Sequence, residues 1–422
     1  MLQVLNRSWA LFLGMFMLMV GNGLQGTLLG LRGNQEGFST FALSIIMSAY
    51  FVGFLFSSQV TPKLIRRVGH VRVFAALGST ISAVLIMYPV LVEPWAWTLG
   101  RVVIGFCFCG VYITAESWLN DASSNETRGK ALSIYLMVQM AGIVAAQYIV
   151  SQGDVGGYAL FIIPSILVSM AFAPILLSIR PTPQFSQTKP MSIRRLIEAS
   201  PLGCMGMFLL GGVFSAQFGM SAVYGSQIGL SVGQISLFVS VIYVAALVAQ
   251  YPIGWISDKI DRRILILWIA MLGGAGALIA FFFPGNFTVI LISAALLGGT
   301  SNPLYALLIA YTNDYLERED MAAASGGLLF INGIGAIAGP LIVGWMMDVL
   351  GANAFWLFSS ALMFLVGIYA IYRMARRSRS ALDLEQTSYS AVSSASSPVL
   401  VEVAQELYVE EEEAEENQPQ AS

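Results

Sequence analysis

The sequence predicts an all-α membrane protein with twelve transmembrane helices in two six-helix bundles related by an internal repeat. The first observation is composition: of 422 residues, 57% are hydrophobic and 11% are charged, whereas a soluble domain carries about 25% charged residues. The second is that 41 glycines are spread among long apolar runs. This is typical of packed membrane helices and not of a barrel, which alternates apolar and polar positions. Composition therefore excludes soluble enzymes, nucleic-acid-binding proteins and outer-membrane barrels.

The third observation is the series of apolar runs of about 20 residues, the length that crosses a bilayer as a helix. The first run has no small-residue cleavage site before or after it and is too long for the core of a signal peptide, so we expect it to be a retained span. The twelve expected spans are residues 9–31, 39–60, 73–92, 95–119, 130–151, 157–179, 201–227, 235–256, 264–284, 287–313, 322–347 and 353–373.

The basic residues predict how these spans are oriented. If the N-terminus is cytoplasmic, 19 of the 21 Lys and Arg residues fall on the cytoplasmic side, which leaves Arg32 in an outer loop and Arg101 within a span. Cytoplasmic loops of membrane proteins are enriched in Lys and Arg. Both termini are therefore expected in the cytoplasm, and the protein is expected in a plasma membrane, specifically a bacterial inner membrane.

The domain organisation follows from the longest internal connection and from a repeat. A proline-containing basic segment separates six spans from six, and a shift of 193 residues places Tyr112 on Tyr305 and Asp121 on Asp314. Repeats of this kind are common in transporters. The expected domains are an N-terminal six-helix bundle at 1–179, a cytoplasmic linker at 180–200, a C-terminal six-helix bundle at 201–379 and a tail at 380–422.

Charge is distributed unevenly along the chain. Residues 380–422 hold ten acidic and no basic residues, whereas residues 1–379 hold 21 basic against 14 acidic residues, a net charge of +7. An acidic segment of this kind buries too little apolar surface to fold, so the tail is expected to be disordered. The three cysteines lie in apolar runs and suggest no disulfide or metal site, and His70 is expected to be solvated in a basic loop. No cofactor or metal is expected.

Two loops and two spans carry motifs. The loop after the eighth span reads Gly254-Trp-Ile-Ser-Asp258-Lys259-Ile-Asp261-Arg262-Arg263, and the loop after the second reads Pro62-Lys63-Leu-Ile-Arg66-Arg67-Val-Gly69-His70-Val-Arg72. The fourth span contains Arg101-Val-Val-Ile-Gly105, and the eleventh contains Gly335-Ala-Ile-Ala-Gly339-Pro340-Leu-Ile-Val-Gly344. With twelve spans in two repeats, this combination resembles the major facilitator superfamily over about residues 8–378.

The run Ala115-Glu116-Ser117-Trp118-Leu119-Asn120 is similar to a poorly characterised bacterial branch of that superfamily, related to sugar and drug transporters. Two positions depart from the pattern: Arg66 stands where Asp is usual, and Asp261 where Gly is usual. The first-half gate is therefore expected to differ chemically from the common scheme. The exchanger motif of the fifth helix is absent, so the motif gives no support for antiport.

In the superfamily fold the first, fourth, seventh and tenth helices line a central cavity. Arg101 should face the interior, because a guanidinium facing lipid costs about 2.5–3.5 kcal/mol. It either binds an anionic or hydroxyl-bearing solute or is structural. Buried amides on these helices either bind solute or join helices. By resemblance, the expected substrate-binding residues are Asn22, Gln25, Arg101, Gln217 and Asn302.

Charged residues at the cytoplasmic ends of the spans are expected to form a gate that bridges the inner mouths of the two bundles when the cavity faces out and separates when it faces in. Glu116 is expected to pair with the first-half arginines, with a proton carrier as the alternative role. The expected gating residues are Arg66, Arg67, Arg72 and Glu116 in the first half and Asp258, Asp261, Arg262 and Asp314 in the second.

These features predict a secondary transporter that moves a small organic solute across the cytoplasmic membrane by alternating access. Protons are a candidate coupling ion, but the absence of a mid-span carboxylate leaves facilitated diffusion open. A multidrug-type exporter is one alternative, and a transporter-fold membrane sensor with the tail as its output is another. The sequence shows no nucleophile with a base, so no enzyme is expected. The expected partners are the solute, protons and the lipid bilayer, with no nucleic acid, and a monomer is expected.

Overall fold

The described residues form helices joined by short turns, as predicted, and no strand occurs among them. Eleven helices are long and apolar enough to cross a membrane, and a twelfth apolar helix is shorter over its described length. The computed structural model describes residues 2–121, 125–176 and 191–376, together with Tyr389, Val392, Ser397 and Val399.

The predicted spans correspond one by one to these helices. The first six are α1 (Leu2–Gln35), α2 (Thr40–Val68), α3 (His70–Met87), α4 (Pro94–Asp121), α5 (Asn125–Gln152) and α6 (Ala159–Leu176). The last six are α8 with η1 and α9 (Pro201–Ser215, Ala216–Met220, Ser221–Gln227), α10 (Val232–Ser257), α11 (Arg262–Phe282), α12 (Phe287–Asn313), α13 (Arg318–Leu350) and α14 (Ala354–Arg376).

Several elements differ from the predictions in detail. The seventh span is one apolar run in the sequence, but a π-helical turn, η1, interrupts it between α8 and α9. The predicted linker contains a short helix, α7 (Ile193–Ala199). His70, predicted to be solvated, is only 3% exposed, because it begins α3 and packs near the Trp118 ring. The domain boundaries stay predictions, and most of the tail lies outside the described residues.

Local sequence signals account for where helices begin and turn. Ser231 and Gln234 form a reciprocal capping box at the start of α10, which satisfies backbone N–H groups that have no partner within the helix. Gly69 separates α2 from α3 at φ 86°, and Gly351 separates α13 from α14 at φ 87°. Both conformations favour glycine, because other residues meet a steric penalty at positive φ.

The internal repeat is visible in how the helices touch. A Cβ at Gly105 of α4 would lie 1.9 Å from the Tyr50 carbonyl oxygen of α2. At the matching place in the second half, a Cβ at Gly298 of α12 would lie 2.3 Å from the Ile242 carbonyl oxygen of α10. Only glycine allows backbones to approach this closely. The pairs α2/α4 and α10/α12 are therefore equivalent packing units, and their close-contact glycines are related by the predicted offset.

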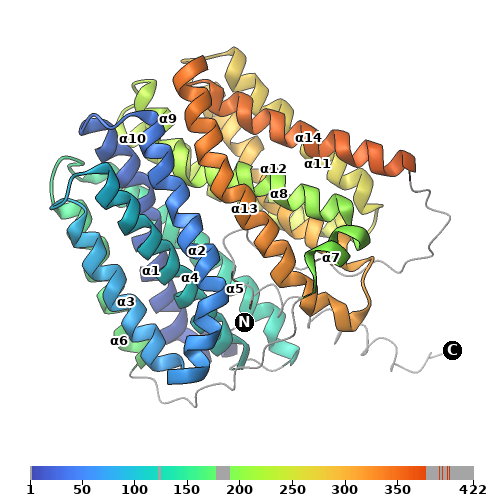
Figure 1. Ribbon diagram of the computed structural model, residues 1–422, viewed down its shortest axis with the longest axis horizontal. Helices are drawn as coiled ribbons and strands as arrows, with labels where there is room; N and C mark the ends of the chain where they lie inside the picture. The colour runs from blue at the N-terminus through green and yellow to red at the C-terminus, as the bar shows by residue number, and fades with distance from the viewer. Residues whose placement is uncertain are drawn as a thin grey trace.

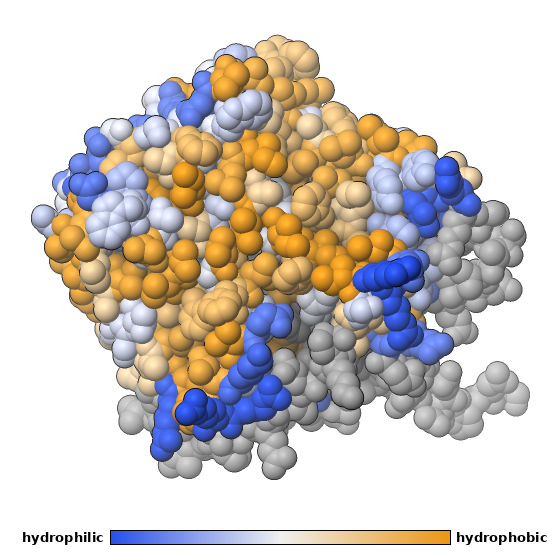
Figure 2. Space-filling model, viewed as in Figure 1, coloured by the Kyte–Doolittle hydropathy of each residue, from blue (hydrophilic) through white to orange (hydrophobic). Residues whose placement is uncertain are grey.

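Figure 1 shows helices α1 to α6 on one side and most of the later helices on the other, with α2 and α13 running side by side between them. Contacts between the two sides also join α5 to α10 and α1 to α9. We call the end of the helices with the α2–α3 turn the inner face and the opposite end the outer face. Figure 2 shows a broad apolar surface with hydrophilic residues toward its rims, as expected for a lipid-facing belt.

Candidate functional site

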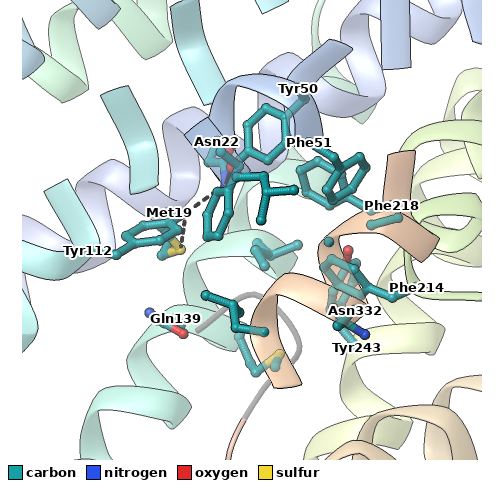
Figure 3. Close-up of a pocket in the computed structure, with 17 residues that line it drawn as sticks. Met19, Asn22, Tyr50, Phe51, Tyr112, Gln139, Phe214, Phe218, Tyr243 and Asn332 are labelled. Carbon is teal, nitrogen blue, oxygen red and sulfur yellow. Dashed lines mark hydrogen bonds between the residues drawn. The ribbon is translucent and has the colours of Figure 1, made fainter. Parts of the chain in front are cut away.

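A pocket lies at mid-depth between the two groups of helices. Side chains from both halves of the chain surround it, among them Asn22 of α1, Tyr112 of α4, Gln139 of α5 and Asn332 of α13 (Figure 3). Its free space is about 740 Å³, counting its open mouth. None of the 17 side chains that line it is charged. The site is therefore concave and mostly apolar with a few polar groups, as small-molecule sites usually are.

Aromatic rings form one wall of this pocket. The Tyr50 and Phe218 ring centroids are 5.4 Å apart, and those of Phe51 and Phe214 are 6.0 Å apart. Phe218 belongs to η1, so the π-helical turn in the seventh span places a ring against α2. Such turns occur frequently at functional sites. The wall thus joins the two halves of the chain and offers flat surfaces to a ligand.

A buried hydrogen-bonded chain connects Arg101 to the pocket. The Arg101 Nη1 donates to Gln25 Oε1 at 2.7 Å, and Gln25 Nε2 donates to Asn22 Oδ1 at 3.1 Å. Asn22 Nδ2 then donates to the Tyr112 hydroxyl at 2.8 Å and to the Tyr50 hydroxyl at 3.4 Å. The structure therefore brings together three of the five predicted substrate-binding residues, although only Asn22 lines the pocket.

Arg101 itself lies behind the aromatic wall with a side chain that is 0% exposed. Its guanidinium carbon is 4.7 Å from the Tyr50 ring centroid and 6.0 Å from that of Phe218, and its Nη2 is 3.6 Å from the Met47 sulfur. Within the described part of the chain, Arg101 forms no ion pair with a carboxylate. Cation–π contacts and one amide thus hold a fully buried charge.

The other two predicted substrate-binding residues lie within the second half, away from the pocket lining. Gln217 Nε2 donates to Ser301 Oγ at 3.0 Å, and Asn302 Nδ2 donates to the Gly298 carbonyl at 3.4 Å. Both side chains are about 97% buried. In this conformation their contacts are those of residues that join helices.

Between the pocket and the outer face, the two halves touch directly. Ser48 Oγ donates to the Ile337 carbonyl at 2.6 Å, and Gln227 Nε2 donates to Thr40 Oγ1 at 2.6 Å. A Cβ at Gly344 of α13 would lie 2.3 Å from the Ser44 Cβ of α2. We call this region, formed by α2 against α13 and α9, the outer seal. It closes the pocket toward the outer face.

The predicted second-half gating residues come together at the inner face, within the C-terminal half. The Arg262 side chain is 1% exposed and forms an ion pair with Asp314, and its Nη2 is 3.7 Å from Asp258 Oδ1. Arg263 pairs with Asp261 at 2.8 Å. Since Arg262 begins α11 and Asp314 follows α12, the buried pair ties neighbouring helices of the same half together.

In the first half, Glu116 lies at the inner end of α4 and is 2% exposed. It accepts hydrogen bonds from the Tyr135 hydroxyl at 3.0 Å and from the Ser397 hydroxyl of the tail. Tyr389 N–H, also in the tail, donates to Asp258 of the second half at 3.1 Å. Burial, with a smaller contribution from the Asp258 carboxylate, raises the pKa of Tyr389, so its phenol stays protonated at neutral pH. Described tail residues therefore contact both halves at the inner face.

The remaining predicted gating residues, Arg66, Arg67 and Arg72, are exposed at the inner face. The sequence interpretation missed the aromatic lining, because aromatic residues occur throughout apolar spans and only packing selects the few that face the pocket. One available signal was the pair of amides Gln139 and Asn332, which would be costly inside a membrane span unless they face a partner or a cavity.

The described residues contain no group of three or more His, Cys, Asp or Glu side chains that could hold a metal ion. The three cysteines are free and buried. The side chains that line the pocket offer stacking and hydrogen bonding to a ligand.

Comparison with known proteins identifies the fold family. The sequence model of the Major Facilitator Superfamily matches residues 11–224 and 202–406. The uncharacterized MFS-type transporter YcaD of Escherichia fergusonii is 24% identical over 359 residues, which cover 83% of this chain and 92% of that protein. YcaD of Salmonella typhimurium is 23% identical over 363 residues, with coverages of 84% and 92%.

Solved structures share the architecture at low sequence identity. The nucleoside transporter NupG has a TM-score of 0.71 at 15% identity, covering 87% of this chain and 98% of that structure. The transporter FucP in the outward conformation has a TM-score of 0.55 at 14% identity, covering 86% and 97%. At these identities the likeness concerns the fold.

Proposed function

The chain belongs to the major facilitator superfamily, and we propose that it is a secondary transporter that moves a small organic solute across the plasma membrane by alternating access. One observation carries the proposal: the pocket is lined from both halves of the chain and is closed toward the outer face by the direct contacts of the outer seal. A site at the interface of two repeats is the arrangement that rocking bundles expose to each side in turn.

In this proposal the inner face is cytoplasmic, and so are both termini. Arg66, Arg67 and Arg72 at the inner face support this orientation, because cytoplasmic loops attract basic residues. The conformation described is then closed to the outside. In the proposed cycle, the solute reaches this pocket from the cytoplasm. The N-terminal bundle of residues 1–179 and the C-terminal bundle of residues 201–379 are the proposed moving bodies.

Protons are the proposed coupling ion. Among the described residues, Glu116 is the acidic side chain that is fully buried, and its carboxylate is held by Tyr135 and Ser397. A buried ionisable group within a membrane span is a candidate proton carrier. FucP has been described as a fucose:proton symporter and NupG as a nucleoside transporter. Both are precedents for a small polar solute in this fold.

The test of alternating access needs no known solute. In a background without the native cysteines, Ser48→Cys reports opening of the outer seal and Met140→Cys reports access to the pocket. An impermeant maleimide is applied to sealed vesicles of each orientation. Asn34→Cys and Lys130→Cys, exposed at opposite faces, are the controls for sidedness. If every molecule visits both states, Ser48→Cys is labelled to completion from outside and Met140→Cys from inside. A Ser48→Cys thiol that stays unlabelled from outside contradicts the proposal.

The tail contacts favour a second candidate function, a transporter-fold sensor with the tail as its output. Ser397 and Tyr389 contact Glu116 and Asp258 on different halves of the chain. A change in the angle between the halves would therefore alter the tail. Truncation after Arg379 separates the two functions, because a transporter retains solute flux without the tail and a sensor loses its signal.

The apolar pocket also fits a multidrug-type exporter, which a broad range of transported cations would favour.

A further inference from the structure

The hydrogen-bonded chain behind the pocket has a fixed direction. A guanidinium has five N–H donors and no acceptor, so the atom of Gln25 that faces Arg101 must be its carbonyl oxygen. The Gln25 amide nitrogen then faces Asn22 and must donate to the Asn22 oxygen. The Asn22 nitrogen is left to face Tyr112 and Tyr50, to which it donates. The charge of Arg101 therefore sets every amide orientation as far as the pocket.

This direction leaves the pocket with hydrogen-bond donors. The Tyr112 oxygen accepts from Asn22, and its hydroxyl is also near the Met19 sulfur at 3.7 Å and the Tyr50 hydroxyl. Sulfur is a weak acceptor. Gln139 of α5 has a buried Nε2 that makes no hydrogen bond of normal geometry among the described residues, although its side chain interacts with the Tyr135 hydroxyl. Both groups line the pocket, so both can donate to an acceptor on a ligand there.

The electrostatics of the site favour an anionic acceptor over a neutral one. Arg101 is fully buried and no described carboxylate pairs with it, while the pocket lining holds no acidic side chain. An unpaired buried charge is costly, and an incoming anion reduces that cost. Hydrogen bonds in a chain also polarise one another, so a cation at one end strengthens the donors at the other.

The rest of the lining specifies the body of the ligand. Phe51, Phe54 and Phe218 present rings to the pocket, which stack well with another flat ring. We propose that the pocket binds an aromatic monocarboxylate, with its ring against these phenylalanines and its carboxylate accepting hydrogen bonds from the Tyr112 hydroxyl and the Gln139 amide. The proposal rests on the proposed transport function, since it names the substrate class of the same site.

The experiment measures binding to the purified full chain with matched probes. Indole-3-acetate and 3-phenylpropionate are compared with their uncharged amides and with hexanoate, which keeps the carboxylate but lacks the ring. Calorimetry gives the affinities, and a thermal shift checks that each ligand binds the folded state. Because a hydrogen bond to a charged group exceeds one to a neutral group, the acids should bind about tenfold more tightly than the amides.

Variants test which groups make the contact. Tyr112→Phe removes one hydroxyl and keeps the ring, so acid affinity should fall about tenfold while amide affinity changes little. Tyr305→Phe is the matched control, because Tyr305 is the repeat counterpart of Tyr112, is buried, and does not line the pocket. Arg101→Gln should also remove the preference for the acid. If the Arg101→Gln variant does not insert into the membrane, the comparison of Tyr112→Phe with Tyr305→Phe still tests the proposed contact.

Three results would each overturn the assignment. They are equal affinities for acid and amide, an affinity loss in Tyr305→Phe equal to that in Tyr112→Phe, and no binding of any aromatic acid to the wild-type protein. The labelling of Ser48→Cys and Met140→Cys requires no ligand. Complete labelling from both sides combined with no acid preference therefore overturns the substrate class alone, whereas unlabelled Ser48→Cys overturns the transport cycle.

Discussion

The outer and inner ends of the interface between the two halves are built from different chemistry. At the outer end, small residues and neutral polar groups of α2, α9 and α13 meet directly, as Gly344 meets Ser44. At the inner end, the ion pair of Arg262 and Asp314 stays within one half. There, Tyr389 and Ser397 of the tail contact residues of the two halves.

This difference teaches that, in the conformation described, the charged pair and the contacts that close the pocket lie at opposite ends of the interface. The sequence predicts that charged residues bridge the inner mouths of the bundles when the cavity faces out, which stays a prediction. In the outer-closed conformation described, the buried second-half pair holds helices of its own half together. The outer seal has no charged pair among its described contacts and depends on close packing, so small changes in volume should move it. Substitutions at the two ends should therefore affect different quantities, stability at one and accessibility at the other.

The largest expected effect is that of Asp314→Asn on stability. Removing the partner of Arg262, which is 1% exposed, leaves a buried charge and should cost about 3–5 kcal/mol. Thermal unfolding of purified protein measures it. Asp258→Asn is the control, because Asp258 is 46% exposed and lies 3.7 Å away, so it should cost less than about 1 kcal/mol. If Asp314→Asn left stability unchanged but opened the outer seal, the separation of the two ends would be wrong.

The next effect is that of Gly344→Val on the outer seal. The new Cβ would lie 2.3 Å from the Ser44 Cβ, and overpacking of this kind costs about 1–3 kcal/mol. Because only the outer-closed state contains this contact, the population should shift toward outer-open by about 5-fold or more. Ser48→Cys labelling should accelerate from outside while Met140→Cys labelling slows from inside. Gly326→Val, on the same helix with nothing within 4 Å of the added Cβ, should change neither rate.

A smaller effect is expected for Gln227→Ala. It removes the 2.6 Å hydrogen bond to Thr40 across the outer seal, worth about 1 kcal/mol, or several-fold in population. Labelling of Ser48→Cys from outside is again the measurement. Gln152→Ala removes a 3.1 Å hydrogen bond to Ser151 within α5 and serves as the matched control. Equal acceleration in both variants would mean that the seal is not held by its specific bonds.

The smallest effect concerns the tail. Ser397→Ala removes the contact with Glu116. That contact should stabilise the docked tail by only about 0.5 kcal/mol, because the entropy lost in ordering the tail opposes it. Labelling of Met140→Cys from inside should accelerate about twofold, as expected for that energy. Glu116→Gln should produce a similar change, and the double variant should add nothing further. Additive effects would indicate that the two residues act independently.

Much of the fold could be predicted from the sequence, because lipid imposes a simple requirement on each span. A helix must satisfy its backbone internally and present about 20 apolar residues, so the runs alone locate it. The interruption at Ala216–Met220 was not predictable in this way, since a π-helical turn leaves the apolar composition unchanged. The burial of His70 was not predicted for a similar reason. The basic loop in the sequence does not reveal that Trp118 packs against His70, the first residue of α3.

For the site, the resemblance singled out the polar residues Asn22, Gln25, Arg101, Gln217 and Asn302, and such groups are costly in a membrane span unless they have partners. That cost reveals which residues need partners but not which partners they have. The sequence by itself determined the membrane class, the twelve helices and the repeat, since these depend on composition and spacing along one chain. The tertiary structure alone decided that Arg101 orients Gln25 and Asn22, and that Phe218 meets Tyr50 across the two halves. Those arrangements depend on contacts between helices far apart in the chain, where hydrogen-bond direction and ring packing are fixed only after the bundles assemble.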